Sequence, residues 1–171
     1  MKVGYAILYE DGELVISKNH TLLQKKIIKD YGKFEDTCVP WKRESAKIKK
    51  VRILDQVKTN CMKAWFGNCM NLLMLIDFEN LDVSNCIDFS YMFYSCNSLQ
   101  DLNGLQNWNV ENGTDFSYMF YNCKSLQEIS LSNTLDILTK EMFELCNPNL
   151  KIHWKNHTYT YTDLLEYEEI C

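Results

Sequence analysis

The feature that most constrains this chain is an internal repeat with a period of 27 residues. Residues 81–100, LDVSNCIDFSYMFYSCNSLQ, align without a gap with residues 108–127, WNVENGTDFSYMFYNCKSLQ, and 13 of the 20 positions are identical. Weaker copies end at Cys69 and Cys146. Such a period is typical of proteins in which each repeat is one supersecondary unit that buries its apolar face only against neighbouring units.

Each repeat has two halves that differ in periodicity. Residues 89–96 carry apolar side chains at i, i+3, i+4 and i+7, and 116–123 repeat this stripe, which predicts a short helix. Asp88 and Asp115 stand just before these segments, where a carboxylate can cap a helix. The second half, as in 126–131, alternates apolar and polar residues like a strand. We expect five strands, centred near residues 51, 75, 102, 129 and 152.

The repeated block Asp-Phe-Ser-Tyr-Met-Phe-Tyr-x-Cys-x-Ser-Leu, preceded by Trp-Asn-Val-x-Asn, resembles the BspA-type (Treponema pallidum-type) leucine-rich repeats of bacterial proteins. The resemblance points to the bacterial and prophage subgroup with SYMFYNC-like repeats, and it covers about Val39 to Trp154. It implies an α/β repeat solenoid, a leucine-rich-repeat stack of about five strands and four short helices. Cys86 and Gly113 stand where that family usually has valine.

The expected domain organisation has three parts: an N-terminal capping segment at 1–38, repeats at 39–150 and a C-terminal cap at 151–171. The first cap is predicted to contain a β-hairpin that turns at Asp11 and Gly12. The second is predicted to be a hairpin followed by a helix over 163–170, with Thr162 as its N-cap.

Cysteine usage favours thiols over disulfides or zinc ligands. The chain has eight cysteines, but no Cys-x-x-Cys pair of the kind that binds zinc. Four of them recur once per repeat in the apolar stripe, and we call these the ladder cysteines: Cys69, Cys96, Cys123 and Cys146. They are predicted to be buried free thiols that pack as small apolar residues, with metal or disulfide roles as the alternative.

The sequence carries no recognisable catalytic motif. It has no glycine-rich phosphate loop and no Gly-x-Ser-x-Gly elbow, and no cysteine stands beside a histidine as a nucleophile and its base would. Its three histidines are His20, His153 and His157, and a predicted hairpin turn separates the last two. We therefore expect a protein that is not an enzyme and that needs no cofactor or metal.

Charge is distributed unevenly along the chain. The formal net charge is −5, and residues 64–123 contain seven acidic residues without a lysine or arginine. Phosphate contacts need cations, so direct nucleic-acid binding by the repeats is not expected, whereas a protein with a basic surface suits them. The candidate partner-binding residues are Asp77, Glu79, Asp101, Glu111, Tyr91, Tyr94, Tyr118, Tyr121, Glu128 and His153. Alternatively, the acids only keep the protein soluble, and the tyrosines only pack between repeats.

These observations favour a protein-binding module that acts inside the cell. The start of the chain lacks the form of a signal peptide, and no apolar run is long enough to span a bilayer, so we expect a cytoplasmic protein without membrane contact. The most concrete hypothesis is a phage-encoded inhibitor of a basic host-defence or nucleic-acid-handling protein. The alternatives are a surface or secreted adhesion module and a scaffold repeat in a larger assembly. The oligomeric state is left open.

Overall fold

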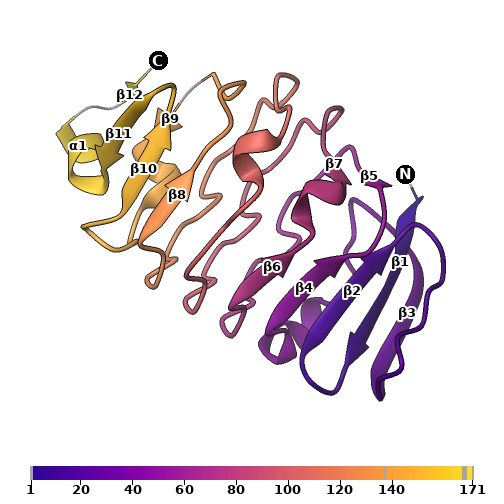
Figure 1. The fold of residues 1–171 in the computed structure, drawn as a ribbon. Coiled ribbons are helices and arrows are strands. Elements are labelled where there is room, and N and C mark those ends of the chain that lie inside the picture. Colours follow the sequence, from indigo (N-terminus) through magenta and orange to yellow (C-terminus); the bar gives the residue numbers. More distant parts are fainter. Residues whose placement is uncertain (1, 137, 167–168, 171) are drawn as a thin grey trace.

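The computed structural model of this protein describes residues 2–136, 138–166 and 169–170 (Figure 1). Its largest sheet combines an N-terminal hairpin with the first repeats. The strand order is β3 (Ile27–Glu35), β1 (Lys2–Tyr9), β2 (Glu13–Ser17), β4 (Lys50–Ile53) and β6 (Met74–Ile76). Within this sheet β1 runs antiparallel to β2 and β3, while β2, β4 and β6 are parallel, so the sheet is mixed.

Three smaller sheets and five short helices complete the described structure. The second sheet has the order β11 (His157–Thr160), β10 (Lys151–Trp154) and β8 (Glu128–Ser130). Two strand pairs follow, β5 (Val57–Lys58) with β7 (Leu81–Asp82) and β9 (Leu138–Thr139) with β12 (Glu169–Ile170). The helices are α1 (Tyr161–Glu166) and the 3₁₀ helices η1 (Lys42–Lys47), η2 (Phe78–Asn80), η3 (Leu105–Asn107) and η4 (Lys140–Phe143).

The predicted α/β leucine-rich-repeat solenoid with four helices is wrong. The described residues instead form mixed and small β-sheets, and their single α-helix lies outside the repeats. No helix covers 89–96 or 116–123, where the apolar stripe predicted one. Both segments are chains of tight turns.

Hydrogen bonds between repeats explain why turns replace the helices. The amides of Tyr91 and Phe93 donate to carbonyl groups of the next repeat, at Ser117 and Met119. The intervening amides donate three residues back, as Tyr94 does to Tyr91. Tyr91 also has a φ of 58°, in the left-handed region that an α-helix does not contain. The neighbouring repeat therefore satisfies amides that an isolated segment would have to satisfy in a helix.

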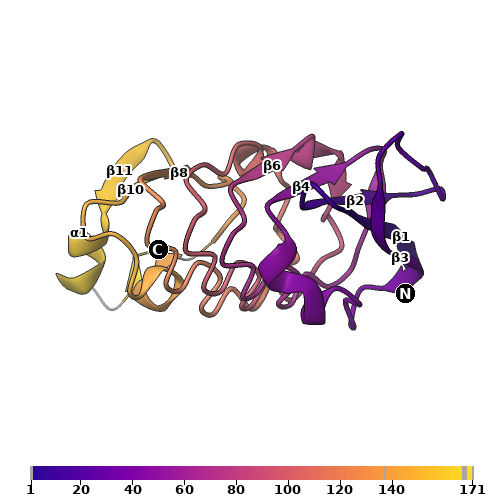
Figure 2. The ribbon, with the colours of Figure 1, turned by 90° about the horizontal axis from the view of Figure 1, so that it is seen from below.

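The apolar stripe is nevertheless buried, and it builds a column of phenylalanine rings. Ring centroids are 5.6 Å apart from Phe66 to Phe93, 5.7 Å from Phe93 to Phe120 and 5.2 Å from Phe120 to Phe143. The expectation that Phe93 and Phe120 are neighbours is thus confirmed. Figure 2 shows β4, β6 and β8 along one long side of the molecule and turn segments of the repeats along the opposite side.

The ladder cysteines lie in the same core, as predicted. All four are buried and free. The thiols of Cys96, Cys123 and Cys146 donate to phenylalanine carbonyl oxygens of the preceding repeat at 3.0–3.2 Å. Burial raises the pKa of Cys69 to about 12. These thiols are therefore neutral packing groups at physiological pH.

The strand predictions are confirmed at four positions and wrong at one. β4, β6, β8 and β10 lie at the predicted centres near 51, 75, 129 and 152, whereas 99–103 belong to no strand. There the apolar residues recur every third position without alternating, and Gly104, with a φ of 103°, turns the chain into η3. The absence of a strand at 99–103 separates the five-stranded sheet, which ends at β6, from the three-stranded sheet, which ends at β8.

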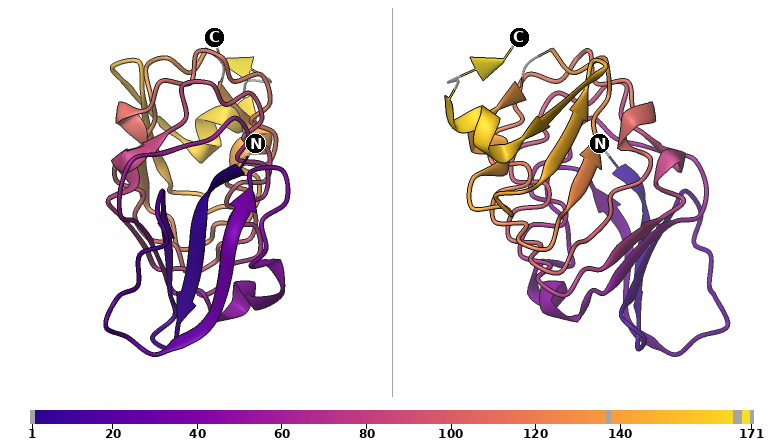
Figure 3. Two further views of the ribbon diagram at one scale, coloured as in Figure 1. Left: turned by 90° about the vertical axis from the view of Figure 1, so that its right-hand side faces the viewer. Right: turned by 60° about the vertical axis from the view of Figure 1, so that its left-hand side comes forward.

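Both predicted hairpins are present, at opposite ends of the molecule (Figure 1), and the left view of Figure 3 has the N-terminal hairpin facing the reader. In the first, Gly12 occupies the turn with a φ of 82°. The C-terminal helix prediction needs correction, because α1 ends at Glu166 and its first turn is capped by Thr160 rather than Thr162. The Asp163 amide donates to the Thr160 hydroxyl, and the Thr160 amide donates to the Asp163 carboxylate, as in a capping box. Of the remaining predicted helix, 169–170 form β12 instead, and 167 and 168 lie outside the described residues.

Candidate functional site

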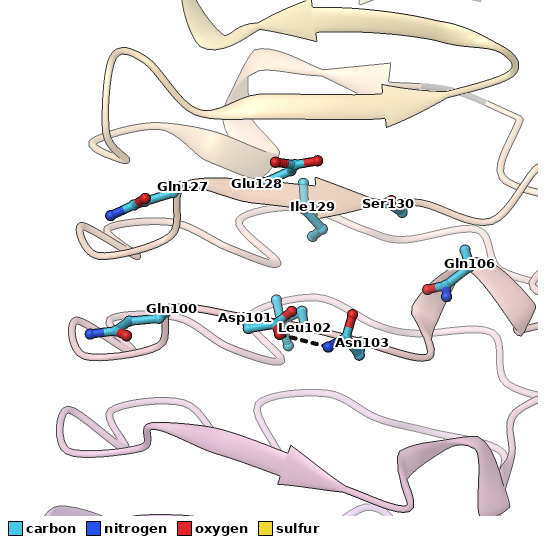
Figure 4. Close-up of a pocket in the computed structure, with 9 residues that line it drawn as sticks. All are labelled: Gln100, Asp101, Leu102, Asn103, Gln106, Gln127, Glu128, Ile129 and Ser130. Carbon is cyan, nitrogen blue, oxygen red and sulfur yellow. Dashed lines mark hydrogen bonds between the residues drawn. The ribbon is translucent and has the colours of Figure 1, made fainter.

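A groove on the sheet side of the molecule lies where the strand near residue 102 is missing. Residues 100–103 join no β-ladder with β6 or with β8. The hollow between 100–103 and β8 has a volume of about 460 Å³ (Figure 4). It therefore separates equivalent positions of two consecutive repeats.

Eight of the nine lining residues stand in pairs that are 27 positions apart, and Gln106 is the ninth. Two buried side chains, Leu102 and Ile129, anchor the groove to the core. Two exposed carboxylates, Asp101 and Glu128, lie in its middle part (Figure 4). Amide and hydroxyl side chains occupy its two ends: Gln100 and Gln127 at one, Asn103, Gln106 and Ser130 at the other.

The two carboxylates are held by neutral or weakly basic neighbours. Asp101 accepts a hydrogen bond from the Asn103 side-chain amide at 2.6 Å. Glu128 lies 2.8 Å from the His153 ring nitrogen Nε2. Within the described residues neither carboxylate forms an ion pair with a lysine or an arginine. Lys151 is the register partner of Glu128 on β10, although it does not line the groove. The groove itself is therefore lined by two carboxylates and by no lysine or arginine, so that it can accept a cation from outside.

His153 also contacts Thr158, which gives the order Thr158–His153–Glu128 found in hydrolase triads. The His153 Nδ1 atom lies 2.9 Å from the Thr158 hydroxyl. His153 and Thr158 are directly paired across β10 and β11, however, and Glu128 is 62% exposed. Cross-strand pairing on a solvated sheet face accounts for these contacts, and water would compete at each of them.

The other predicted acidic residues are not gathered at the groove. Asp77 forms an ion pair with Arg52 at 3.2 Å, and Arg52 also pairs with the buried Glu13 at 2.7 Å. Glu79 and Glu111 are exposed but line neither the groove nor the adjoining hollow at β10 and β11. The predicted acidic surface is therefore partly neutralised, and only Asp101 and Glu128 share one site.

The four predicted tyrosines form one cluster on the turn segments, which we call the tyrosine array: Tyr91, Tyr94, Tyr118 and Tyr121. Ring centroids are 5.2 Å apart for Tyr91 and Tyr118 and 4.9 Å for Tyr94 and Tyr121, and the latter rings are nearly parallel at 4°. Tyr91 is 37% exposed, and the others are half-buried. The array therefore packs between repeats and also presents aromatic surface to solvent.

Sequence reasoning missed the amide groups of the groove, Gln100, Gln106 and Gln127. Gln100 and Gln127 close the two best repeat copies at identical positions, which was the available signal. In the described parts of the chain no group of three or more His, Cys, Asp or Glu side chains could hold a metal ion. No helix of the described residues is long and apolar enough to cross a membrane.

The fold and the groove define a repeat protein whose described repeats contain short 3₁₀ helices but no α-helix, with a polar, acidic surface hollow. The family model described as "Mycoplasma protein of unknown function, DUF285" matches residues 34–154, and the chain belongs to this family. No curated protein and no solved structure matches the chain.

Proposed function

We propose that this protein is a non-enzymatic binding module that recognises a basic segment of another protein in the groove between residues 100–103 and β8. The observation that carries the proposal is the adjacent pair of exposed carboxylates, Asp101 and Glu128, without a lysine or arginine partner among the described residues. The guanidinium group of a partner's arginine suits two carboxylate groups, because it donates several hydrogen bonds in fixed directions.

The remaining groove residues supply what an extended peptide needs. The side chains of Gln100 and Gln127 at one end, and of Asn103 at the other, offer donors and acceptors for peptide groups. The backbone of 100–103 belongs to no β-ladder and faces the same hollow. Charge complementarity in such a site mainly raises the association rate and sets specificity.

The test is affinity capture from producing cells with the parent chain and with the double variant Asp101→Asn, Glu128→Gln. A matched control, Glu79→Gln with Glu111→Gln, removes the same charge from exposed positions outside the groove. We expect the parent and the control to capture the same basic protein and the groove variant to capture at least about tenfold less. Equal capture by the groove variant would show that another surface binds.

Two further measurements separate binding from folding and from bulk charge. The unfolding free energy of the groove variant should stay within about 0.5 kcal/mol of the parent, as for other exposed substitutions. The association rate of the captured partner should fall with added salt as the Debye length drops from about 10 Å to about 3 Å. This salt dependence should be weaker in the groove variant than in the control.

We also propose that the chain is related to BspA-type proteins, which the SYMFYNC-like motif and the DUF285 match support. The resemblance makes a surface or secreted adhesion module the second candidate function. The cytoplasmic location and the phage-inhibitor role remain predictions. Fractionation of producing cells distinguishes the two locations, because an adhesion module would be found outside the cytoplasmic fraction.

A further inference from the structure

The tyrosine array stops abruptly toward the N-terminal end of the repeats. Tyr94 stacks on Tyr121 of the next repeat, but the equivalent residue of the preceding repeat is Gly67. In the same way Tyr91 stacks on Tyr118, and its preceding equivalent is Ala64. The column of rings thus lacks its next member at a place where the backbone repeat continues.

The position of the missing rings is a hollow of about 380 Å³. Ala64, Gly67 and Asn68 come from the turn segment, and Tyr91 and Tyr94 line the side toward the next repeat. Lys42 and Ser45 of η1 complete the lining. Lys42 is exposed and forms no ion pair in the part of the chain that the structure describes.

We propose that this hollow binds an aromatic side chain of a partner protein that is flanked by a carboxylate. The incoming ring continues the column and stacks against Tyr91 or Tyr94 at the spacing of about 5 Å that aromatic pairs adopt. The flanking carboxylate pairs with Lys42, while Asn68 and Ser45 hydrogen bond to the partner's peptide groups. Each group of the hollow then has a role in the complex.

The lining favours a protein side chain over a nucleotide. One cationic side chain, that of Lys42, lines the hollow. The lining has no glycine-rich loop of backbone amides, and such a loop is what phosphate groups usually require. The array extends beyond the hollow and offers further aromatic surface for the partner, as protein interfaces do around an anchoring residue. This inference does not depend on the acidic groove, because the two sites share no lining residue.

The test uses the acetylated and amidated tripeptide Glu-Trp-Glu as a probe of the full-length protein, with Glu-Ala-Glu as the control peptide. Titration is followed by the NMR signals of the tyrosine rings. We expect shifts of Tyr91 and Tyr94 with Glu-Trp-Glu, and at least about tenfold weaker binding of the control peptide.

Two variants fill the hollow with the repeat's own residue. Gly67→Tyr has a structural precedent, because Gly67, Tyr94 and Tyr121 make the same three-residue turn hydrogen bond. A Cβ atom at Gly67 would lie 3.2 Å from the Tyr91 carbonyl oxygen, so a small adjustment is required. Ala64→Tyr is the second variant, since its φ of 53° resembles the 58° of Tyr91. Both should reduce probe binding at least about tenfold while preserving the thermal unfolding temperature.

Lysine variants test the ionic contact. Lys42→Gln should weaken binding up to about fivefold, as expected for an exposed ion pair, and Lys47→Gln on the same helix should leave it unchanged. The proposal is overturned if Glu-Trp-Glu does not bind, or if a folded variant with a filled hollow binds it as tightly as the parent does. Tighter binding of adenosine monophosphate than of Glu-Trp-Glu would instead assign the hollow to nucleotides and also overturn it.

Discussion

Replacement of Phe120 by alanine should remove a large part of the free energy of unfolding. Phe120 is fully buried, and its ring stacks between Phe93 at 5.7 Å and Phe143 at 5.2 Å. Loss of a core phenylalanine costs about 3–5 kcal/mol, and each aromatic pair contributes about 0.5–1.5 kcal/mol beyond its burial. The range for core phenylalanines already includes such ring contacts, so two stacked neighbours place Phe120 in its upper part, at about 4–5 kcal/mol. That loss is close to the whole stability of a marginal domain.

The assay is urea unfolding followed by circular dichroism, with Phe116→Ala as the matched control. Phe116 is only half-buried and stacks on Phe89 at 4.9 Å. Its loss should cost less than half as much as that of Phe120. A loss below about 1 kcal/mol for Phe120→Ala, or equal losses for both variants, would refute the role of the phenylalanine column, because core truncations rarely cost so little.

Three further predictions concern polar groups that are buried or half-buried. Burial raises the pKa of Cys69 to about 12, so at pH 8 the ladder cysteines should resist alkylation that modifies the exposed Cys38. The free energy of unfolding should fall as the pH rises from about 9 toward 12, because only the unfolded thiols ionise in that range. Rapid labelling of the ladder cysteines in the native protein would contradict this prediction. Burial raises the pKa of Glu13, but hydrogen bonds from Lys25 and Arg52 outweigh it and leave that pKa below its ordinary 4.5. Glu13→Gln should therefore cost about 1–3 kcal/mol in urea unfolding at pH 7 and progressively less as the pH falls below 4.5, and an unchanged difference at pH 3 would count against the ion pair. Asp88→Ala should cost about 1–2 kcal/mol of unfolding free energy in the same assay, and more than Asp115→Ala. Asp88 accepts hydrogen bonds from both the amide and the hydroxyl of Ser90, whereas Asp115 accepts one from the amide of Ser117. Equal losses for the two variants would contradict this explanation.

Much of the core could be predicted from the sequence, because one repeat suffices to identify its buried side chains. The stripe that includes Phe93 and Cys96 is fully buried, as its spacing indicated. Its backbone conformation could not be predicted in the same way. The spacing i, i+3, i+4 and i+7 places the side chains of Phe93 and Cys96 on one face both in a helix and in consecutive three-residue turns. The choice depends on hydrogen bonds to another repeat, such as that from the Phe93 amide to Met119, which no single repeat encodes.

The candidate sites were only partly predictable for a related reason. The spacing placed the tyrosines off the buried stripe, but the hollow beside Tyr91 arises from the small residues Ala64 and Gly67 and from η1, which lies outside the repeat pattern. The acidic groove arises where the strand near residue 102 fails to form. Charge counting overestimated the acidic surface, because it could not foresee that Arg52 neutralises Asp77.

Photo-cross-linking from the groove tests the central claim most directly. A photoreactive amino acid in place of Gln127, which lines one end of the groove, would be activated in producing cells, with the same residue in place of the exposed Lys124 as the control. We predict that position 127 captures one protein, and that mass spectrometry places the cross-link within a segment rich in arginine or lysine. Cross-links that form equally from position 124, or that map to an acidic segment, would contradict the recognition of a basic partner in this groove.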